Sequence, residues 1–323
     1  MPINYKETAR ENEYVLPKEF ATSSETAIIL PEVSAMIAFL FPGQGSQRRG
    51  MAQGLFDQRE YAAVESSVDS LLGYSMRALC LEDAGNKLSE TQYTQPSLYV
   101  ANALHYYDAL NRGERPSMLA GHSLGEYDAL FAAGAFDFLT GLRLVKKRGE
   151  IMAQARNGGM AAIMGLATSR TEQVIQENGL ASIDVANYNA PSQTVISGPV
   201  DDINRAKTSF EKAGAMFFPL RVSAAFHSRY MAEAANAFAE FMAPFQFNAL
   251  SIPVIANATG QPYPNENPTE TIKSLLVKQI RQPVLWTQSI RYMKGAGVTE
   301  FKEVGPGNVL SKLVQQIQQS NDG

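Results

Sequence analysis

The chain has 323 residues, 45% of them hydrophobic and 19% charged, and its formal net charge is -4 at pH 7. A chain of this length and composition can bury a substantial core, and its negative charge argues against nucleic acid as the main partner. No stretch approaches the about 18 consecutive apolar residues of a membrane span, and the N-terminal region lacks the apolar core of a signal peptide, so we expect no membrane partner and a cytoplasmic location.

The first predicted elements follow a polar segment. Residues 1–34 are polar and mixed in charge, and we interpret them as a flexible tail or the remnant of a linker. The apolar run 36–41 predicts a buried strand that ends in a glycine-rich turn, and helical patterns such as 95–110 then alternate with short apolar runs. This alternation indicates an α/β fold in which helices cover a parallel sheet.

The pattern of elements changes between residues 158 and 221. Six short segments there predict, in order, a strand, a helix, two strands, a helix and a strand, at 160–163, 171–177, 183–187, 194–197, 200–213 and 216–222. This is the order of a split βαββαβ unit, which we interpret as a small inserted subdomain over 158–221.

Strand patterns at 252–257 and 299–304 then return the chain to a large subdomain, made of residues 35–157 and 222–323. We expect a cleft between the two subdomains.

Ser123 lies in the sequence Gly-His-Ser-Leu-Gly at 121–125, between a short apolar run and a stretch compatible with a helix. A strand that leads into a helix through a turn with glycine on both sides of a serine is the pattern of a nucleophile elbow. The pentapeptide alone is weak evidence, and the strand-turn-helix setting is what strengthens it. The pattern predicts an acyl-enzyme intermediate on Ser123.

A base for Ser123 can be sought among three histidines. His122 adjoins the serine, so its side chain points elsewhere, and His105 lies in a helical stretch typical of a packed or surface histidine. His227 remains, although a lone histidine among small and apolar residues is more often structural. No Asp or Glu stands out to orient it, so a dyad oriented by an amide or a backbone carbonyl is predicted.

The histidines lack zinc-like spacing and the chain has one cysteine, so we expect neither a metal nor a disulfide.

A glycine-rich loop at 41–47 follows the first predicted strand. Its glycines let backbone N–H groups approach a ligand, although the same sequence can be a simple flexible turn. The Lys-Ser/Thr pair of a phosphate-binding P-loop is missing. We therefore favour an oxyanion hole, with one N–H from this loop and one from Leu124, the residue after the nucleophile.

Arg148 lies in the sequence Val-Lys-Lys-Arg-Gly-Glu at 145–150. On composition alone, a solvated cationic helix face is the more common interpretation. The alternative is a guanidinium that binds a substrate carboxylate through two parallel hydrogen bonds. Spacing alone does not decide between them.

Taken together, the motifs resemble the malonyl-CoA:acyl carrier protein transacylases and the acyltransferases of polyketide synthases. The resemblance runs from Ala38 to Leu313 and rests on several ordered motifs: Phe-Pro-Gly-Gln-Gly-Ser-Gln at 41–47, Thr-Gln-Pro at 94–96, Gly-His-Ser-Leu-Gly-Glu at 121–126, Arg-Gly at 148–149, Ala-Phe-His-Ser at 225–228 and Val-Gly-Pro-Gly at 304–307. The details are most similar to the free-standing acyltransferases of trans-acyltransferase polyketide synthases. The resemblance implies an α/β-hydrolase-like parallel-sheet core with an inserted ferredoxin-like small subdomain.

The resemblance also implies a reaction. Ser123 would take a malonyl group from malonyl-CoA and pass it to the phosphopantetheine thiol of an acyl carrier protein, with His227 as general acid and base. No bound cofactor is expected. The resemblance assigns the oxyanion hole to Gln44 and Leu124. It assigns substrate binding to Arg148, Gln95, Phe226 and His122. It also implies that the backbone carbonyl of Gln279 orients His227.

One feature of the resemblance concerns specificity. Methylmalonyl-selective relatives carry a serine at the position of Phe226, in a Tyr-Ala-Ser-His pattern. The larger Phe226 should narrow the pocket here, so malonyl is the favoured acyl group.

The surface that meets the carrier protein can also be predicted. Carrier proteins are acidic, so a basic rim around the cleft is expected despite the net negative charge of the chain. The candidates are Arg48, Arg49, Lys146, Lys147 and Arg229.

Two alternatives stay open. A sister branch of the family hydrolyses stalled acyl groups from carrier proteins and keeps the serine and histidine, but it has no use for a buried cation such as Arg148. A non-catalytic module that only docks carrier protein would have lost the nucleophile, the base or the oxyanion loop, and all three patterns are present here.

Overall fold

A computed structural model describes residues 35–320, which contain two separate sheets. The prediction for residues 1–34 lies outside the described residues. The larger sheet has five strands in the order β8-β7-β2-β1-β9. Its strands are β1 (Ile37–Phe41), β2 (Met118–Gly121), β7 (Val254–Ala256), β8 (Gln261–Pro262) and β9 (Glu300–Glu303). All neighbours pair in parallel except β7 and β8, so the predicted parallel sheet is confirmed.

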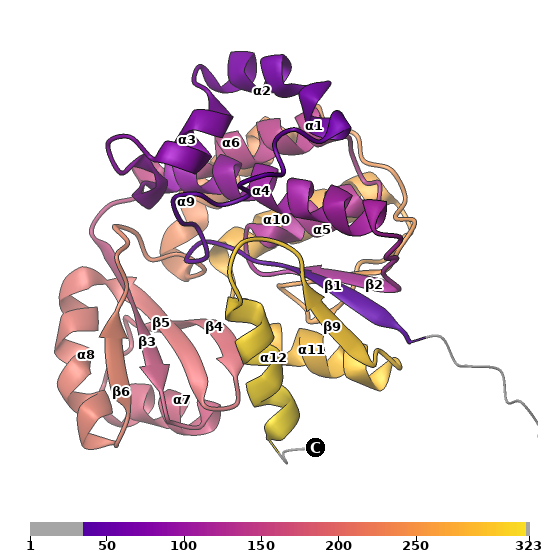
Figure 1. Cartoon of the computed structure of the whole chain (residues 1–323). Coiled ribbons are helices and arrows are strands. Elements are labelled where there is room, and N and C mark those ends of the chain that lie inside the picture. The colour runs from indigo at the N-terminus through magenta and orange to yellow at the C-terminus, as the bar shows by residue number, and fades with distance from the viewer. Residues whose placement is uncertain (1–34, 321–323) are drawn as a thin grey trace, which may run out of the picture. The chain divides into compact units, whose positions relative to one another are not determined.

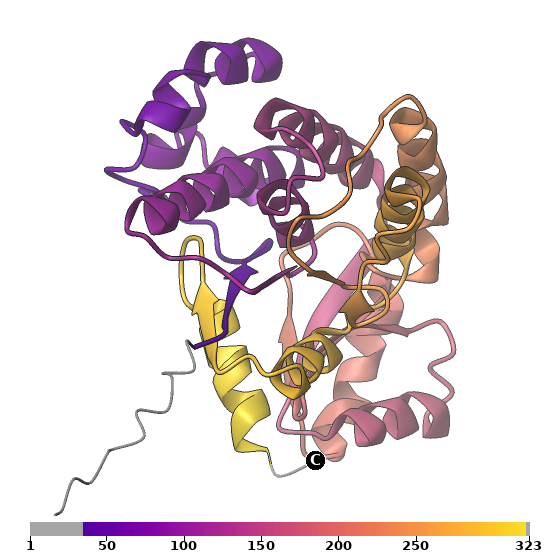
Figure 2. The same ribbon diagram turned by 90° about the vertical axis from the view of Figure 1, so that its right-hand side faces the viewer.

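The larger sheet is covered by helices on both faces, as Figures 1 and 2 show. Successive side chains of β1 point to opposite faces of the sheet, so Phe39 and Phe41 pack in one apolar cluster and Ala38 and Leu40 pack in another. The first cluster is packed by helices that include α4 (Thr91–Asn111), α5 (Gly125–Ala132), α6 (Phe138–Gln154), α9 (Ala232–Met242) and α10 (Pro268–Arg281). The second is packed by α11 (Trp286–Gly295) and α12 (Val309–Gln319). A strand buried on both faces explains the unbroken apolar run at 36–41.

Several short helices precede or separate these elements. Their bounds are Arg59–Ala62 (α1), Glu65–Leu72 (α2), Met76–Glu82 (α3), Lys87–Ser89 (η1) and Arg229–Met231 (η2). In Figure 1 the first three lie at the top of the molecule, away from both sheets.

The smaller sheet is antiparallel, with strands in the order β4-β5-β3-β6. Its elements are, in chain order, β3 (Gly158–Met164), α7 (Thr168–Glu177), β4 (Asp184–Ala190), β5 (Gln193–Pro199), α8 (Val200–Lys212) and β6 (Met216–Pro219). These are the six elements that the sequence predicts, in the predicted order. A third apolar cluster, which includes Phe210, lies between this sheet and its two helices.

Backbone hydrogen bonds join the edge strand β4 to the segment after α10. Asn187 forms an isolated parallel bridge with Val284. The amide of Tyr188 donates to Val284 O at 2.9 Å, and the amide of Val284 donates to Ala186 O at 2.9 Å. The edge strand β4 is thereby bonded directly to residues between α10 and α11.

Predicted and observed bounds differ where packing overrides local preference. The helix expected over 95–110 begins at Thr91 and continues through Pro96. Proline disfavours a helix interior, but every residue from 94 to 104 is buried here, and that burial stabilises the helix around Pro96. The strand expected over 216–222 ends at Pro219.

Within residues 35–320, no helix is long and apolar enough to span a membrane.

Two glycines allow the turn between β2 and α5 to pack against β1. A Cβ added at Gly125 would lie 2.0 Å from Phe41 O, and one added at Gly121 would lie 1.9 Å from Gly125 C. Both distances are far inside van der Waals contact with backbone atoms, which have no rotamer with which to move away. This close approach explains why glycine stands on both sides of the serine.

We expect Gly125→Ala to lower the free energy of unfolding by about 3 kcal/mol or more, because the methyl group must displace the backbone of β1. Urea unfolding measures the change. Gly295→Ala is a matched control, since its Cβ would meet no atom within 4 Å, and we expect a change of at most about 0.5 kcal/mol there. Equal stability of the two variants would contradict this account of the turn.

Candidate active site

Ser123 occupies the tight turn between β2 and α5. Its φ is 53°, in the left-handed region that a non-glycine residue rarely adopts. The side chain of Asn257 holds the turn from the end of β7: its Oδ1 accepts from Ser123 N at 2.7 Å, and its Nδ2 donates to Gly121 O at 2.6 Å. The turn has the strained geometry of a nucleophile elbow, with the strain offset by a buried amide.

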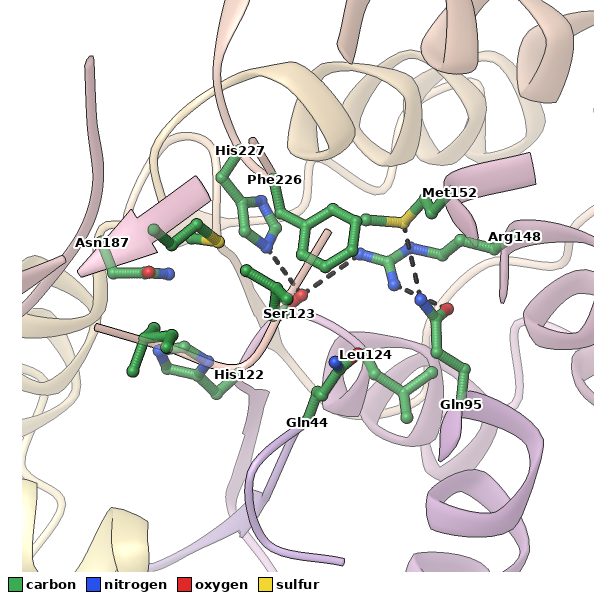
Figure 3. A pocket seen from close by; sticks show the side chains of 13 residues that line it. Gln44, Gln95, His122, Ser123, Leu124, Arg148, Met152, Asn187, Phe226 and His227 are labelled. Atoms are coloured by element: carbon green, nitrogen blue, oxygen red, sulfur yellow. Dashed lines mark hydrogen bonds between the residues drawn. The ribbon is translucent and has the colours of Figure 1, made fainter. Parts of the chain in front are cut away.

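His227 lies beside Ser123, although the two residues are far apart in the sequence. Ser123 Oγ and His227 Nε2 are 2.8 Å apart (Figure 3). His227 Nδ1 lies 2.7 Å from the backbone oxygen of Gln279 on α10. Because a carbonyl can only accept, Nδ1 carries the proton and Nε2 is free to accept the serine proton. This is the geometry of a nucleophile and a base oriented by a backbone carbonyl.

The environment of His227 keeps its ring neutral. Burial, followed by the positive charge of Arg148, lowers the pKa of His227 to about 3. An imidazole with that pKa is unprotonated at neutral pH, as a general base must be before it takes a proton.

Arg148 lies inside the protein, with 1% of its surface exposed. The solvated helix face favoured on composition is therefore wrong for this residue. Its Nη1 donates to Gln95 Oε1 at 2.8 Å, and its Nη2 donates to Ser123 Oγ at 3.2 Å (Figure 3). Its Nη2 also donates to Gln279 Oε1 at 2.9 Å. Its guanidinium carbon also lies 5.5 Å from the ring centre of Tyr127.

All the side-chain acceptors around Arg148 are neutral. Among residues 35–320, no carboxylate lies within 4.0 Å of its guanidinium nitrogens, and its Nε has no hydrogen-bond partner. Burial lowers the pKa of Arg148. A buried cation without a direct counter-charge is costly, so the site is suited to receive an anionic group beside Ser123.

Two backbone amides are available for an oxyanion. Gln44 and Leu124 both line the cavity that contains Ser123. Within the described part of the chain, neither amide N–H donates to a protein acceptor. Free N–H groups of this kind can stabilise the negative oxygen of a tetrahedral intermediate.

The cavity at Ser123 is small. Its volume is about 100 Å³, and it is lined by Gln44, Gln95, His122, Ser123, Leu124, Arg148, Met152, Met160, Asn187, Leu220, Val222, Phe226 and His227. The lining therefore brings together all of the sequence-predicted site residues except Gln279. That residue contacts the site from behind, through Arg148 and His227.

His122 faces the smaller sheet, not the nucleophile. Its Nε2 lies 2.8 Å from Asn189 Oδ1, and its ring packs edge-on against Trp286 with 5.4 Å between ring centres. His122 is nevertheless one of the residues that line the cavity.

Sequence reasoning missed a second layer of buried polar residues. Asn257, Glu126, Tyr263 and the carboxamide of Gln279 form a continuous set of hydrogen bonds behind Ser123. One usable signal existed for Asn257, which is the last residue of the strand predicted over 252–257 in the same parallel sheet and so lies at the same edge as the elbow. Glu126 ends the motif at 121–126, but its partners Tyr263 and Gln279 lie more than 100 positions away, and no local pattern indicates these contacts.

The candidates for the basic rim differ in their surroundings. Arg229 pairs with Asp184, and Lys146 pairs with Glu150. Arg48 and Arg49, which follow the glycine-rich loop, are exposed.

Within residues 35–320, no group of three or more His, Cys, Asp or Glu side chains is suited to hold a metal ion.

Comparison with known proteins decides the family. The model of the acyl transferase domain matches residues 38–323. A polyketide biosynthesis malonyl CoA-acyl carrier protein transacylase of Bacillus velezensis is 51% identical over 290 residues, which are 89% of this chain and 98% of that protein. The chain belongs to the acyl transferase domain family. The recognition made from the motifs is thus confirmed, including the similarity to polyketide relatives.

Solved structures of other acyl transferase domains have the same fold. A malonyl CoA-acyl carrier protein transacylase from Burkholderia pseudomallei aligns with a TM-score of 0.85 and 45% identity, covering 90% of this chain and 100% of that one. A malonyl-transacylase solved in complex with a type II polyketide synthase acyl-carrier protein aligns with a TM-score of 0.82 and 33% identity, covering 88% and 93% of the two chains.

Removing the guanidinium should raise the pKa of His227, because Arg148 is one of the two main causes of its low value. The base works only when neutral, so reactivity falls as pH drops through that pKa. We expect Arg148→Ala to move the acid limb of Ser123 reactivity to higher pH. Because the pKa of His227 in the wild-type protein is about 3, the labelling rate of Ser123 with a fluorophosphonate must be followed from about pH 3 to about pH 7 to test this. Superimposable profiles for wild type and variant would contradict it, and Ser123→Ala gives the background.

Proposed function

We propose that this acyl transferase domain moves a malonyl group from malonyl-CoA, through an ester with Ser123, to the phosphopantetheine thiol of an acyl carrier protein in polyketide biosynthesis. The observation that carries the proposal is the buried guanidinium of Arg148, which lies 3.2 Å from Ser123 Oγ and lacks a direct carboxylate partner. A malonyl group carries the carboxylate that such a cation needs, and an acetyl group does not.

The names of the relatives support this substrate class. The Bacillus velezensis relative is called a polyketide biosynthesis malonyl CoA-acyl carrier protein transacylase, as is a Bacillus subtilis relative that is 50% identical over 285 residues. A relative from Escherichia coli called malonyl CoA-acyl carrier protein transacylase is 38% identical over 289 residues. These names also support the interpretation of the chain as an enzyme.

In the first half of the reaction, Ser123 Oγ attacks the thioester carbonyl while His227 Nε2 takes its proton. The amides of Gln44 and Leu124 donate to the oxyanion of the tetrahedral intermediate. Collapse of the intermediate breaks the carbon–sulfur bond, and the proton on His227 passes to the departing CoA thiol. The malonyl carboxylate meanwhile accepts hydrogen bonds from Arg148.

In the second half, the phosphopantetheine thiol takes the place of CoA. It attacks the ester carbonyl as His227 takes the thiol proton, the same two amides donate to the oxyanion, and the proton returns to Ser123 Oγ as the ester bond breaks. The carrier protein leaves as a malonyl thioester, and the enzyme returns to its starting protonation state.

The shape of the cavity favours malonyl over branched acyl groups. The side chain of Phe226 is buried and lines a cavity of only about 100 Å³, together with Met152 and Met160. A ring at that position leaves little room for a substituent at the α-carbon of the acyl group.

We further propose that the two sheets are an α/β-hydrolase-like core, over 35–157 and 222–323, and a ferredoxin-like subdomain inserted at 158–221. The strand order β6-β3-β5-β4 together with the βαββαβ element order supports the second assignment. The nucleophile elbow after β2 supports the first. The cavity is lined from both parts, so substrate would bind between them.

Intact-protein mass spectrometry tests the reaction directly. We expect a malonyl adduct on wild-type protein after brief incubation with malonyl-CoA, none on Ser123→Ala, and transfer of the adduct when a phosphopantetheinylated carrier protein is added. Release of free malonate without transfer would instead favour a hydrolase. Absence of any adduct would contradict the proposal.

Arg148→Ala should change the choice of acyl group. We expect kcat/KM for malonyl-CoA to fall by about 100-fold, because loss of a buried charged partner costs about 3 kcal/mol, while kcat/KM for acetyl-CoA is spared or rises. Steady-state rates with both donors measure this. An equal loss for both donors would count against the assignment of Arg148 to the carboxylate.

A further inference from the structure

Glu126 is a buried acidic residue that the reaction described above does not use. It follows the elbow on α5 and has no exposed surface. Its Oε1 accepts from the hydroxyl of Tyr263 and from the amide of Asn257, and its Oε2 accepts from Gln279 Nε2 at 2.6 Å. Glu126 is not among the residues that line the cavity at Ser123.

The carboxamide of Gln279 has one possible orientation. Its Nε2 donates to Glu126 Oε2 and to Ser123 O, at 2.6 and 2.7 Å. The carboxylate and the backbone carbonyl are both acceptors, so the nitrogen must face them. The carboxamide oxygen therefore faces Arg148 Nη2, at 2.9 Å.

Gln279 thus stands between a buried carboxyl group and a buried guanidinium. A carboxylate in direct contact with Arg148 would form a short charge-assisted pair and satisfy the cation inside the protein. The intervening carboxamide places its nitrogen toward the carboxyl group of Glu126 and its oxygen toward the guanidinium of Arg148, so the two charged groups do not touch. The guanidinium is stabilised but remains without a direct anionic partner.

We propose that Gln279 is a specificity-determining spacer, whose carboxamide separates Arg148 from its buried counter-charge Glu126 and thereby leaves the guanidinium able to bind the carboxylate of the acyl group. The inference rests on the proposed malonyl transfer and goes beyond it, because it assigns selectivity to two residues outside the cavity lining. Gln279 also orients His227, but through its backbone carbonyl, which side-chain substitutions leave in place.

The ionisation of Glu126 sets the conditions for a test. Burial raises the pKa of Glu126 to about 7, against the opposing effects of its hydrogen bonds from Tyr263, Gln279 and Asn257 and of the charge of Arg148. The carboxyl group is therefore charged at pH values above about 7. We choose about pH 8 for all measurements, so that the counter-charge is present.

Exchanging the two residues gives a matched variant. Glu126→Gln with Gln279→Glu keeps the composition and net charge of the chain. The new carboxamide at position 126 can still accept from Asn257 and donate to the new carboxylate at position 279, so the hydrogen bond between the two positions is reversed. Ser123 O loses its donor from position 279, as it also does in any variant without the carboxamide. The carboxylate now touches Arg148 directly.

In the exchanged variant we expect the ratio of kcat/KM for malonyl-CoA to that for acetyl-CoA to fall at least about tenfold, since the guanidinium already has an anionic partner. We expect the loss to appear mainly as a higher KM for malonyl-CoA. Gln279→Met is the control: it removes the carboxamide without adding charge, and its ratio should stay within about threefold of wild type because the cation still lacks a direct carboxylate.

Each outcome has a distinct meaning. A wild-type ratio in the exchanged variant overturns the inference and leaves malonyl transfer intact. An equal fall in Gln279→Met also overturns it, because the side chain would then act only by packing. If the wild-type protein forms no malonyl adduct, the proposed function itself fails. If the exchanged variant does not fold, as judged by its thermal unfolding, Gln279→Glu alone makes the same contact and must show the same fall.

Discussion

The site depends on one unusual condition, a guanidinium buried beside a nucleophilic serine and surrounded by neutral acceptors. Moving a cation out of water costs several kcal/mol unless other groups replace the lost solvation. Here Gln95 and Gln279 supply carboxamide oxygens and Tyr127 supplies an aromatic face. These partners hold Arg148 in place without neutralising it. The same charge lowers the pKa of His227, so one buried cation affects both the substrate that can bind and the base that reacts.

The two sheets supply different parts of this arrangement. The larger sheet presents Ser123 and Asn257 at the carboxyl ends of two neighbouring parallel strands, where polar groups from distant segments meet. The smaller sheet supplies cavity walls such as Met160 and Asn187, and the chain then carries His227 back to the elbow. A rigid elbow and a separately held base can thus be combined without either sheet losing its own core.

The parts that could be predicted from sequence are those with a local pattern. The glycines around Ser123, the six alternating elements of the smaller sheet and the apolar strand at 36–41 are each encoded within a few residues. The bounds of α4 were less predictable, because burial outweighs the effect of Pro96. Arg148 was ambiguous, since a helix sequence does not reveal what covers its face. Glu126, Asn257 and Tyr263 act only through contacts across more than 100 positions, which no window of the sequence contains.

The bridge between Asn187 and Val284 has a mechanical consequence. Asn187 lines the cavity, and Val284 follows α10, the helix that ends soon after the carbonyl that orients His227. A bulky acyl group that wedged the two sheets apart would therefore pull on the backbone next to that helix. An oversized acyl group would therefore bind more weakly, because it strains the cavity walls. It would also react more slowly, because His227 would no longer be aligned with Ser123.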